Sequence, residues 1–241
     1  MITEEIAKKI VDSGLSHLHF SIDGLEQAND FVRGVGIFRK AIRSVELLNK
    51  EKQRCNRVLS IGIACIIMNH SLEDLSKLLE FADTLNINVI NFQPLVKDNT
   101  DMRNRCNTEF WVSEKRLPIL ERSIKEIKNF KREHINIYEN PKLELYLKYY
   151  KRNLSSWDWK CFGGYKTLFI CPTERGPSVH TCHGICGYLR ETSLKGCWFS
   201  KEAKRLRKSA KRCTSLCLQA CHSRIESESL VKLFRKYWGI S

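Results

Sequence analysis

The stretch VLSIGIACIIMNHSLEDLSKLLEFADTLNINVINFQP, residues 58–94, decides the fold class of this chain. Residues 58–67 are almost all apolar, and a short run of this kind is typical of a buried strand. Ser71 opens SLED, a capping-box pattern that predicts the start of a helix. A second strand, over 88–93, ends at Pro94. The helix between the strands carries an apolar stripe of Leu72, Leu75, Leu79 and Ala82. Strand, helix and strand at this spacing predict a parallel α/β sheet.

An earlier strand is expected in HLHFSIDG, residues 17–24, between helices over 3–12 and 37–50. Its apolar positions alternate with a polar set, made of His17, His19, Ser21 and Asp23. In a β/α barrel, polar side chains near the carboxyl end of a strand can line a site, so Ser21 and Asp23 are candidates. The dipeptide Asp23-Gly24 is equally compatible with a simple turn.

The same alternation continues in strand 88–93, where Asn91 and Gln93 point to one side. Downstream, Ser113 is expected to cap a helix that ends near Arg132. A short strand over 135–139 and a helix near 141–151 follow. The cysteine density changes after these elements, which predicts two domains, 1–152 and 153–241. The predicted fold class is α/β, a partial β/α barrel followed by a small cysteine-rich domain.

The composition and charge bear on whether the protein binds nucleic acid, associates with membranes or is secreted. The 241 residues include 41 basic and 27 acidic side chains, a net charge of +14, and eleven cysteines. The basic residues are scattered apart from the run 201–212, so solvated helix faces are favoured over nucleic-acid binding. No apolar run approaches the roughly 18 residues of a membrane span, so we expect no membrane association. The amphipathic N-terminus is unlike a signal peptide, which predicts cytoplasm, where thiols stay reduced and ligate metals.

Eight of the eleven cysteines fall between residues 161 and 221. A hairpin that turns at 173–176 could bring Cys161 and Cys182 together. The trio Cys213, Cys217 and Cys221 could supply further thiolates, whose pKa values the basic surroundings should lower. Four thiolates suit either an iron–sulfur cluster or a tetrahedral zinc ion, and the spacing leaves both open. Cys171 and Cys186 could be further ligands or small buried residues. Cys197 is expected to be a packing residue, and Cys55, Cys65 and Cys106 are expected to be core or loop thiols.

Taken together, these residues resemble a radical S-adenosylmethionine (SAM) protein with a SPASM or twitch-type C-terminal domain. The resemblance rests first on residues 15–48, LSHLHFSIDGLEQANDFVRGVGIFRKAIRSVELL, and on residues 63–95, which are similar to the fourth, fifth and sixth strands of that barrel. It rests next on a spacing pattern, in which fourteen residues separate Cys161 from Gly176 and five separate Gly176 from Cys182. Gly187 with RETSL, Trp198 with SKEAKRLR and the final cysteine trio complete it.

The resemblance implies sites for two cofactors. Ser21, Asp23 and Arg33 would lie near the SAM pocket, with Asn69 and Gln93 at strand ends on the same face. An auxiliary [4Fe-4S] cluster would be held by Cys161, Cys182, Cys213 and either Cys217 or Cys221. In this family a reduced cluster cleaves SAM to a radical that abstracts hydrogen from a substrate. The implied partners are a peptide or protein substrate and a reducing donor such as a flavodoxin or ferredoxin. The catalytic residues are not identified by the resemblance.

The sequence departs from the family pattern in one large respect and two small ones. The CxxxCxxC segment that holds the SAM-binding cluster is absent. The chain begins just before the counterpart of the fourth strand, as expected for a truncated or split gene product or for a start at an internal Met. We therefore expect weak or no SAM binding by this chain alone, and a companion N-terminal fragment. Tyr188 replaces a frequent Asn, and the last cysteines have the spacing Cys-x3-Cys.

Two other functions stay open on the sequence. The chain could be an iron–sulfur module for electron transfer or peptide binding, without catalysis. It could also be a zinc-stabilised basic protein with a structural or nucleic-acid-binding role. The metal bound by the thiolates separates these possibilities.

Overall fold

The computed structural model describes residues 2–96, 109–138, 142–155, 157–159, 162–213 and 217–218. The chain divides into two compact units, Met1–Asn153 and Leu154–Ser241. Within those described ranges, no helix combines the length and the apolar character needed to cross a bilayer.

A four-stranded parallel sheet forms the centre of the first unit, in the order β1-β2-β3-β4. Its strands are β1 (His17–Ser21), β2 (Ser60–Ile67), β3 (Val89–Pro94) and β4 (Asn136–Tyr138). The helices around it are α1 (Glu4–Asp12), α2 (Glu26–Arg33), α3 (Ile37–Arg54), α4 (Leu75–Thr84), α5 (Leu117–Asn129) and α6 (Glu144–Tyr150). Short 3-10 turns, Asn69–Asp74 and Glu114–Arg116, precede α4 and α5. This arrangement confirms the predicted parallel α/β unit.

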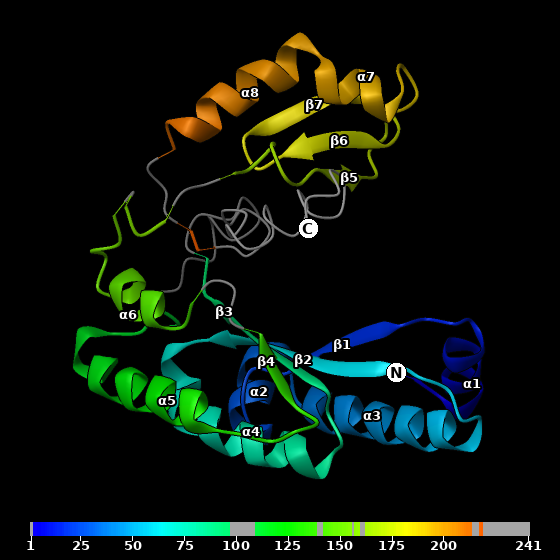
Figure 1. The fold of residues 1–241 in the computed structure, drawn as a ribbon, viewed down its shortest axis with the longest axis vertical. Coiled ribbons are helices and arrows are strands. Elements are labelled where there is room, and N and C mark those ends of the chain that lie inside the picture. Colours follow the sequence, from blue (N-terminus) through cyan, green and yellow to red (C-terminus); the bar gives the residue numbers. More distant parts are fainter. Residues whose placement is uncertain are drawn as a thin grey trace, which may run out of the picture. The chain divides into compact units, whose positions relative to one another are not determined.

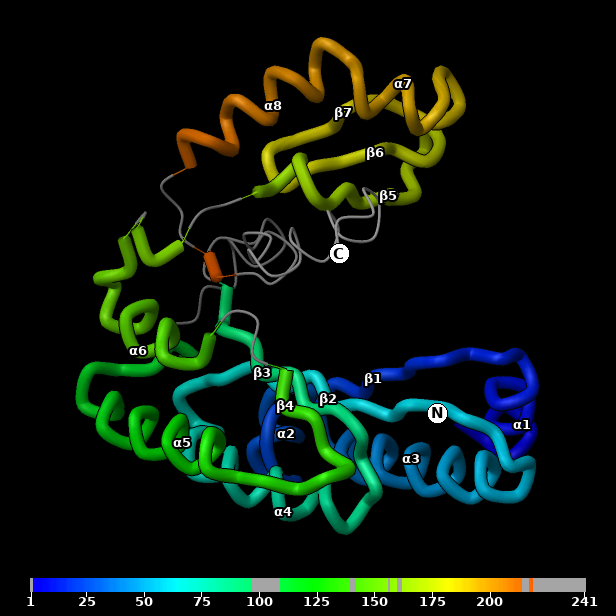
Figure 2. The backbone as a smooth tube through the Cα atoms, in the orientation of Figure 1, coloured from blue at the N-terminus to red at the C-terminus, as the bar shows by residue number. Residues whose placement is uncertain are grey.

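Helices α2 to α5 lie along one face of this sheet (Figure 1). The chain leaves each strand, returns through the helical layer and enters the next strand in the same direction (Figure 2). The core therefore forms between sheet and helices, where Ile61, Ile63, Ile90 and Leu79 are at most 1% exposed. Leu18 and Phe20 of β1 are only half-buried, because β1 is paired on one side and the helices cover it less completely.

Both helices predicted to begin at a serine cap begin later. Ser71 lies inside the first 3-10 turn, is fully buried, and donates from Oγ to the carbonyl of Met68. Helix α4 starts at Leu75, because Ser71 packs against the chain at Gly24 and does not cap. Ser113 likewise precedes a 3-10 turn and its side chain makes no capping hydrogen bond.

Helix α6 fastens the carboxyl ends of the strands. The Tyr146 hydroxyl donates to the carbonyl of Phe92 at 2.6 Å, and the Tyr149 hydroxyl donates to that of Leu95 at 2.7 Å. Tyr150 donates to the carbonyl of Ile67 and accepts from the Leu95 amide. Burial raises the pKa of Tyr146 and Tyr150, so both stay protonated donors.

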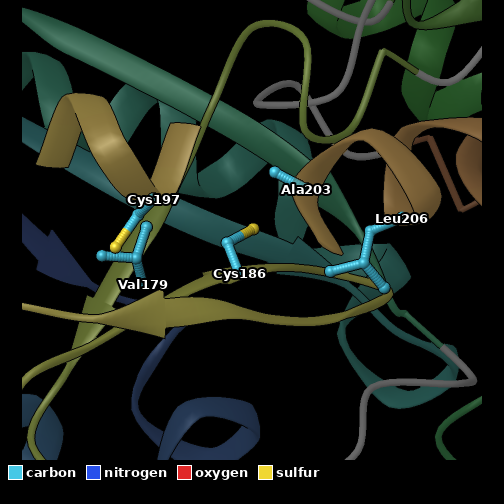
Figure 3. Close-up of a cluster of buried hydrophobic side chains, with 5 residues drawn as sticks. All are labelled: Val179, Cys186, Cys197, Ala203 and Leu206. Atoms are coloured by element: carbon cyan, nitrogen blue, oxygen red, sulfur yellow. The ribbon is translucent and has the colours of Figure 1, made fainter. Parts of the chain in front are cut away.

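The described residues of the second unit form a three-stranded antiparallel sheet and two helices. The strands are β5 (Phe169–Cys171), β6 (Ser178–Thr181) and β7 (Gly184–Tyr188), and the helices are α7 (Leu194–Phe199) and α8 (Lys201–Lys211). Strands β5 and β6 form the predicted hairpin. Its small core contains Val179, Cys186, Cys197, Ala203 and Leu206 (Figure 3).

Candidate functional site

The sheet face opposite the helices carries polar side chains in register. Ser21, Ala64, Asn91 and Tyr138 form one row across the four strands. Gln93 lies beyond that row, beside Ile66. The Asn91 Oδ1 atom is buried and has no hydrogen-bond partner among the described residues. This face therefore offers polar groups near the carboxyl ends of the strands, where α/β sheets bind ligands.

His19 lies across the middle of this face. A Cβ atom built on Gly62 would stand 2.5 Å from the His19 Nδ1 atom, far inside van der Waals contact. The missing side chain of Gly62 therefore lets the imidazole rest on the strand. Sequence alternation placed His19 on this face, but the close approach to Gly62 depends on the pairing of β1 with β2.

Asp23 acts as an internal clamp at the end of β1. Its side chain is fully buried, Oδ2 accepts from the Arg33 Nε at 2.7 Å, and Oδ1 accepts from the Ile66 amide at 2.8 Å. The carboxylate replaces the next backbone acceptor that β1 would have offered to β2. The structure thus brings Asp23 and Arg33 together just past the end of β1, two residues after the exposed Ser21.

Neighbouring side chains hold the same loop. Asn29 is fully buried and its Oδ1 accepts from the Asp23 amide at 3.1 Å. Asp30 accepts from the amides of Phe38 and Gly36, which joins α2 to the start of α3. The amide of Phe38 is the main cause that lowers the pKa of Asp30. Sequence reasoning missed Asn29 and Asp30, because Asp30 lies inside α2 and reaches the amides at the start of α3 only when the two helices pack.

Asn69 and Gln93 differ in their surroundings. The Asn69 amide donates to the carbonyl of Phe110 at 2.9 Å, and its Oδ1 accepts from the Ser113 amide at 3.2 Å. Asn69 therefore fastens the chain that leads into α5. Gln93 is half-buried on β3, and its side chain belongs to the polar face.

The thiols of the second unit fall into two groups by burial. Cys186 and Cys197 are 5% and 0% exposed and belong to the core (Figure 3). Cys197 fits against Gly187, where an added Cβ would stand 2.9 Å from its Sγ atom. Cys182 is exposed on the turn between β6 and β7, and Cys171 at the end of β5, Cys213 and Cys217 are half-buried. The two remaining predicted ligands, Cys161 and Cys221, lie outside the described residues.

Three described segments next to Cys161, Cys182 and Cys213 pack together at one end of the second unit. A Cβ on Gly164 would stand 2.8 Å from the Thr181 Cγ2 atom, and Gly164 has a φ of +75°. A Cβ on Gly184 would stand 3.3 Å from the Leu206 side chain on α8. The segment after Cys161, the turn with Cys182 and the helix before Cys213 therefore meet.

The donor set suits a soft metal or an iron–sulfur cluster, because the exposed and half-buried thiols are left outside the core. Within the described ranges, no three cysteine, histidine or acidic side chains come together as metal ligands. Cys161 and Cys221 are outside these ranges.

Among known proteins, solved structures match the fold of this chain, whereas sequence comparisons find no match. No family model and no curated protein matches the sequence. Solved structures of anSMEcpe, an anaerobic sulfatase-maturating radical SAM enzyme, do match the fold. The first unit has a partial β/α fold like that of these structures. The match to anSMEcpe with bound AdoMet has a TM-score of 0.54 and 17% identity, over 99% of this chain and 71% of that chain.

Two further anSMEcpe structures agree with the first. The hexahistidine-tagged enzyme with bound AdoMet has a TM-score of 0.55 and 17% identity, with 99% and 71% of the chains covered. The complex with AdoMet and the Cp18Cys peptide has a TM-score of 0.54 and 16% identity, with 99% and 72% covered. At this level of identity the likeness shows the fold.

Proposed function

We propose that this chain is a radical SAM protein whose second unit binds one auxiliary [4Fe-4S] cluster through cysteine thiolates. The observation that carries the proposal is the fold match over 99% of the chain to an enzyme solved with AdoMet. The separation of core thiols from exposed and half-buried thiols supports the cluster. The proposed ligands are Cys161, Cys182, Cys213 and either Cys217 or Cys221.

A bound cluster of this type supplies one-electron chemistry or a coordination site for substrate. The chain's own residues contribute the surroundings. The Asp23–Arg33 clamp fixes the loop at the end of β1 and so orients Ser21, which shares a row of the sheet with Asn91. Gln93 lies beyond that row on the same face. Asn69 holds the chain that leads into α5, which fixes the position where β2 ends. These side chains would bind and orient a polar ligand on the open sheet face.

The proposed substrate is a peptide or protein, since anSMEcpe has been solved with peptides bound. The proposed electron source is a reducing protein such as a flavodoxin or ferredoxin, and the proposed compartment is the cytoplasm.

The test measures iron, sulfide and zinc per chain after anaerobic reconstitution, together with the EPR spectrum of the reduced sample. About four irons with matching sulfide support the proposal. Cys182→Ala should lose most of the iron, because it removes a thiolate. Cys197→Ala is the matched control: it removes a core thiol, should lower stability by about 1 kcal/mol, and should leave the iron content unchanged.

Three outcomes would contradict the assignment. Zinc without sulfide in the wild-type chain would make the thiols a structural metal site. Unchanged iron in both Cys161→Ala and Cys182→Ala would remove these two thiolates from the ligand set. Equal iron loss in Cys182→Ala and Cys197→Ala would mean that the loss reports unfolding.

A further inference from the structure

Arg207 is the one α8 side chain, among the residues described in the second unit, that donates hydrogen bonds to two other segments. Its Nε atom donates to the carbonyl of Gly164 at 2.8 Å, and its Nη2 atom donates to the carbonyl of Trp198 at 2.7 Å. The guanidinium carbon also lies 4.3 Å from the centre of the Trp198 ring. One planar group therefore joins α8, the end of α7 and the segment around Gly164.

The Gly164 contact extends to the turn between β6 and β7. Gly164 fits between Thr181 and Arg207, since an added Cβ would stand 2.8 Å from the Thr181 Cγ2 atom and 3.5 Å from the Arg207 Cγ atom. Thr181 immediately precedes Cys182, and its Oγ1 accepts from the His183 amide at 3.1 Å. The position of Gly164 thus depends on Arg207 and limits where the Cys182 turn can lie.

The last turn of α8 also contacts the segment around Gly164. The Lys211 Nζ atom lies 5.5 Å from the centre of the Tyr165 ring, one residue after Gly164. Cys213 follows Lys211 by two residues, directly after the helix. The 164–165 segment therefore runs beside the last turn of α8, toward Cys213.

We propose that Arg207 is a positioning residue for the thiolates: it holds the 164–165 segment, the Cys182 turn and α8 in the arrangement in which Cys182 and Cys213 ligate one iron–sulfur cluster. This inference rests on the proposed function. A lysine at this position would keep the charge, but its single ammonium group lacks the planar fork that reaches two carbonyls at once. Groups that orient metal ligands typically change metal affinity by about 10–100-fold when they are replaced.

The experiment compares the full-length wild-type chain with Arg207→Lys and Arg207→Met. Each is reconstituted anaerobically, and the rate of iron loss to a chelator and the EPR spectrum of the reduced cluster are recorded. The matched control is Arg205→Lys, because Arg205 lies on the same helix, is exposed and pairs only locally with Glu202. Thermal melting of the iron-free chain, followed by circular dichroism, measures the fold separately.

We expect both Arg207 variants to lose iron about tenfold faster than wild type or more, with an altered EPR line shape. The iron-free Arg207→Lys chain should keep its helical signal at the assay temperature, and Arg205→Lys should match wild type throughout. If Arg207→Lys also unfolds, Gly164→Ala decides, because it keeps the guanidinium and places a methyl group 2.8 Å from the Thr181 Cγ2 atom beside the Cys182 turn. Wild-type iron retention in a folded Gly164→Ala chain would refute the proposed arrangement.

Two further results would overturn the inference, and they are distinguishable. In the first, the wild-type chain holds about four irons, and the Arg207 variants retain iron and give EPR spectra as the wild type does. This result would refute the positioning role and leave the proposed function intact. A wild-type chain without iron and sulfide would overturn both.

Discussion

Arg33 Nε lies 2.7 Å from Asp23 Oδ2, and this ion pair closes the end of β1 against β2. Asp23 is completely buried, whereas the Arg33 side chain keeps 27% of its surface exposed. The second carboxylate oxygen accepts from the Ile66 amide, so both oxygens are engaged. The Asp23 carboxylate therefore links the end of β1 to helix α2 through Arg33 and to the neighbouring strand β2 through Ile66. The position of the end of β1 on the polar face thus depends on one buried charge.

Replacing Asp23 with Ala should lower the free energy of unfolding by about 3 kcal/mol, because Arg33 and the Ile66 amide lose their partner. Asp23→Asn should cost less, since an amide oxygen still accepts from Ile66. Urea denaturation of the full-length chain measures both. Arg39→Ala is the control: its pair with Glu26 is exposed and should be worth less than about 1 kcal/mol. Equal losses in Asp23→Ala and Arg39→Ala would refute the clamp.

The stability of the first unit should fall as the pH is lowered below about 6.5, the ordinary pKa of histidine, in part through His70. This ring packs edge-on against Phe31 and Phe110, and burial lowers the pKa of His70 in the folded chain. Between the folded and unfolded pKa values the unfolded chain binds more protons, so acid favours unfolding. Denaturation curves at several pH values check the direction.

His70→Phe should flatten this pH dependence, because it removes the group whose protonation favours the unfolded chain. His17→Gln, which removes an exposed histidine, is measured beside it for comparison. A His70→Phe chain with the wild-type slope would assign the effect to other groups.

Gly164→Ala should destabilise the second unit by about 1–2 kcal/mol, from a left-handed backbone and a methyl group placed against Thr181. Thr181→Ser removes the clashing methyl and retains the oxygen that accepts from His183. The double variant should therefore recover part of the loss in thermal melting. Strictly additive effects of the two substitutions would disprove the contact.

Gly62→Ala should displace the His19 ring from the open face of the sheet. The new methyl would stand 2.5 Å from the His19 Nδ1 atom and 3.2 Å from the Val89 carbonyl oxygen. His19 is exposed and can move, so we expect a cost of about 1 kcal/mol and a shifted His19 NMR resonance. In a His19→Ala background the same substitution should cost measurably less. Identical losses in the free energy of unfolding in the two backgrounds would show that the His19 ring does not lie against Gly62.

The parallel sheet was predictable from residues 58–94, because buried parallel strands are nearly continuous apolar runs separated by one amphipathic helix. The alternation in 17–24 also predicted which side chains of β1 share a face. The start of α4 was wrong by four residues, since a capping pattern is local and the packing of Ser71 near Gly24 is not. The cluster ligands stay a prediction.

By itself the sequence determined the α/β class, the polar alternation within β1 and within β3, and the crowding of thiols in the last third of the chain. Those properties follow from periodicity and composition, which act between near neighbours. Only the tertiary structure decided that Asp23 is a buried clamp, that Cys186 and Cys197 belong to the core, and that Arg207 joins three segments. Each of these depends on contacts between residues far apart in the chain, and burial and partner choice are set only when the segments pack.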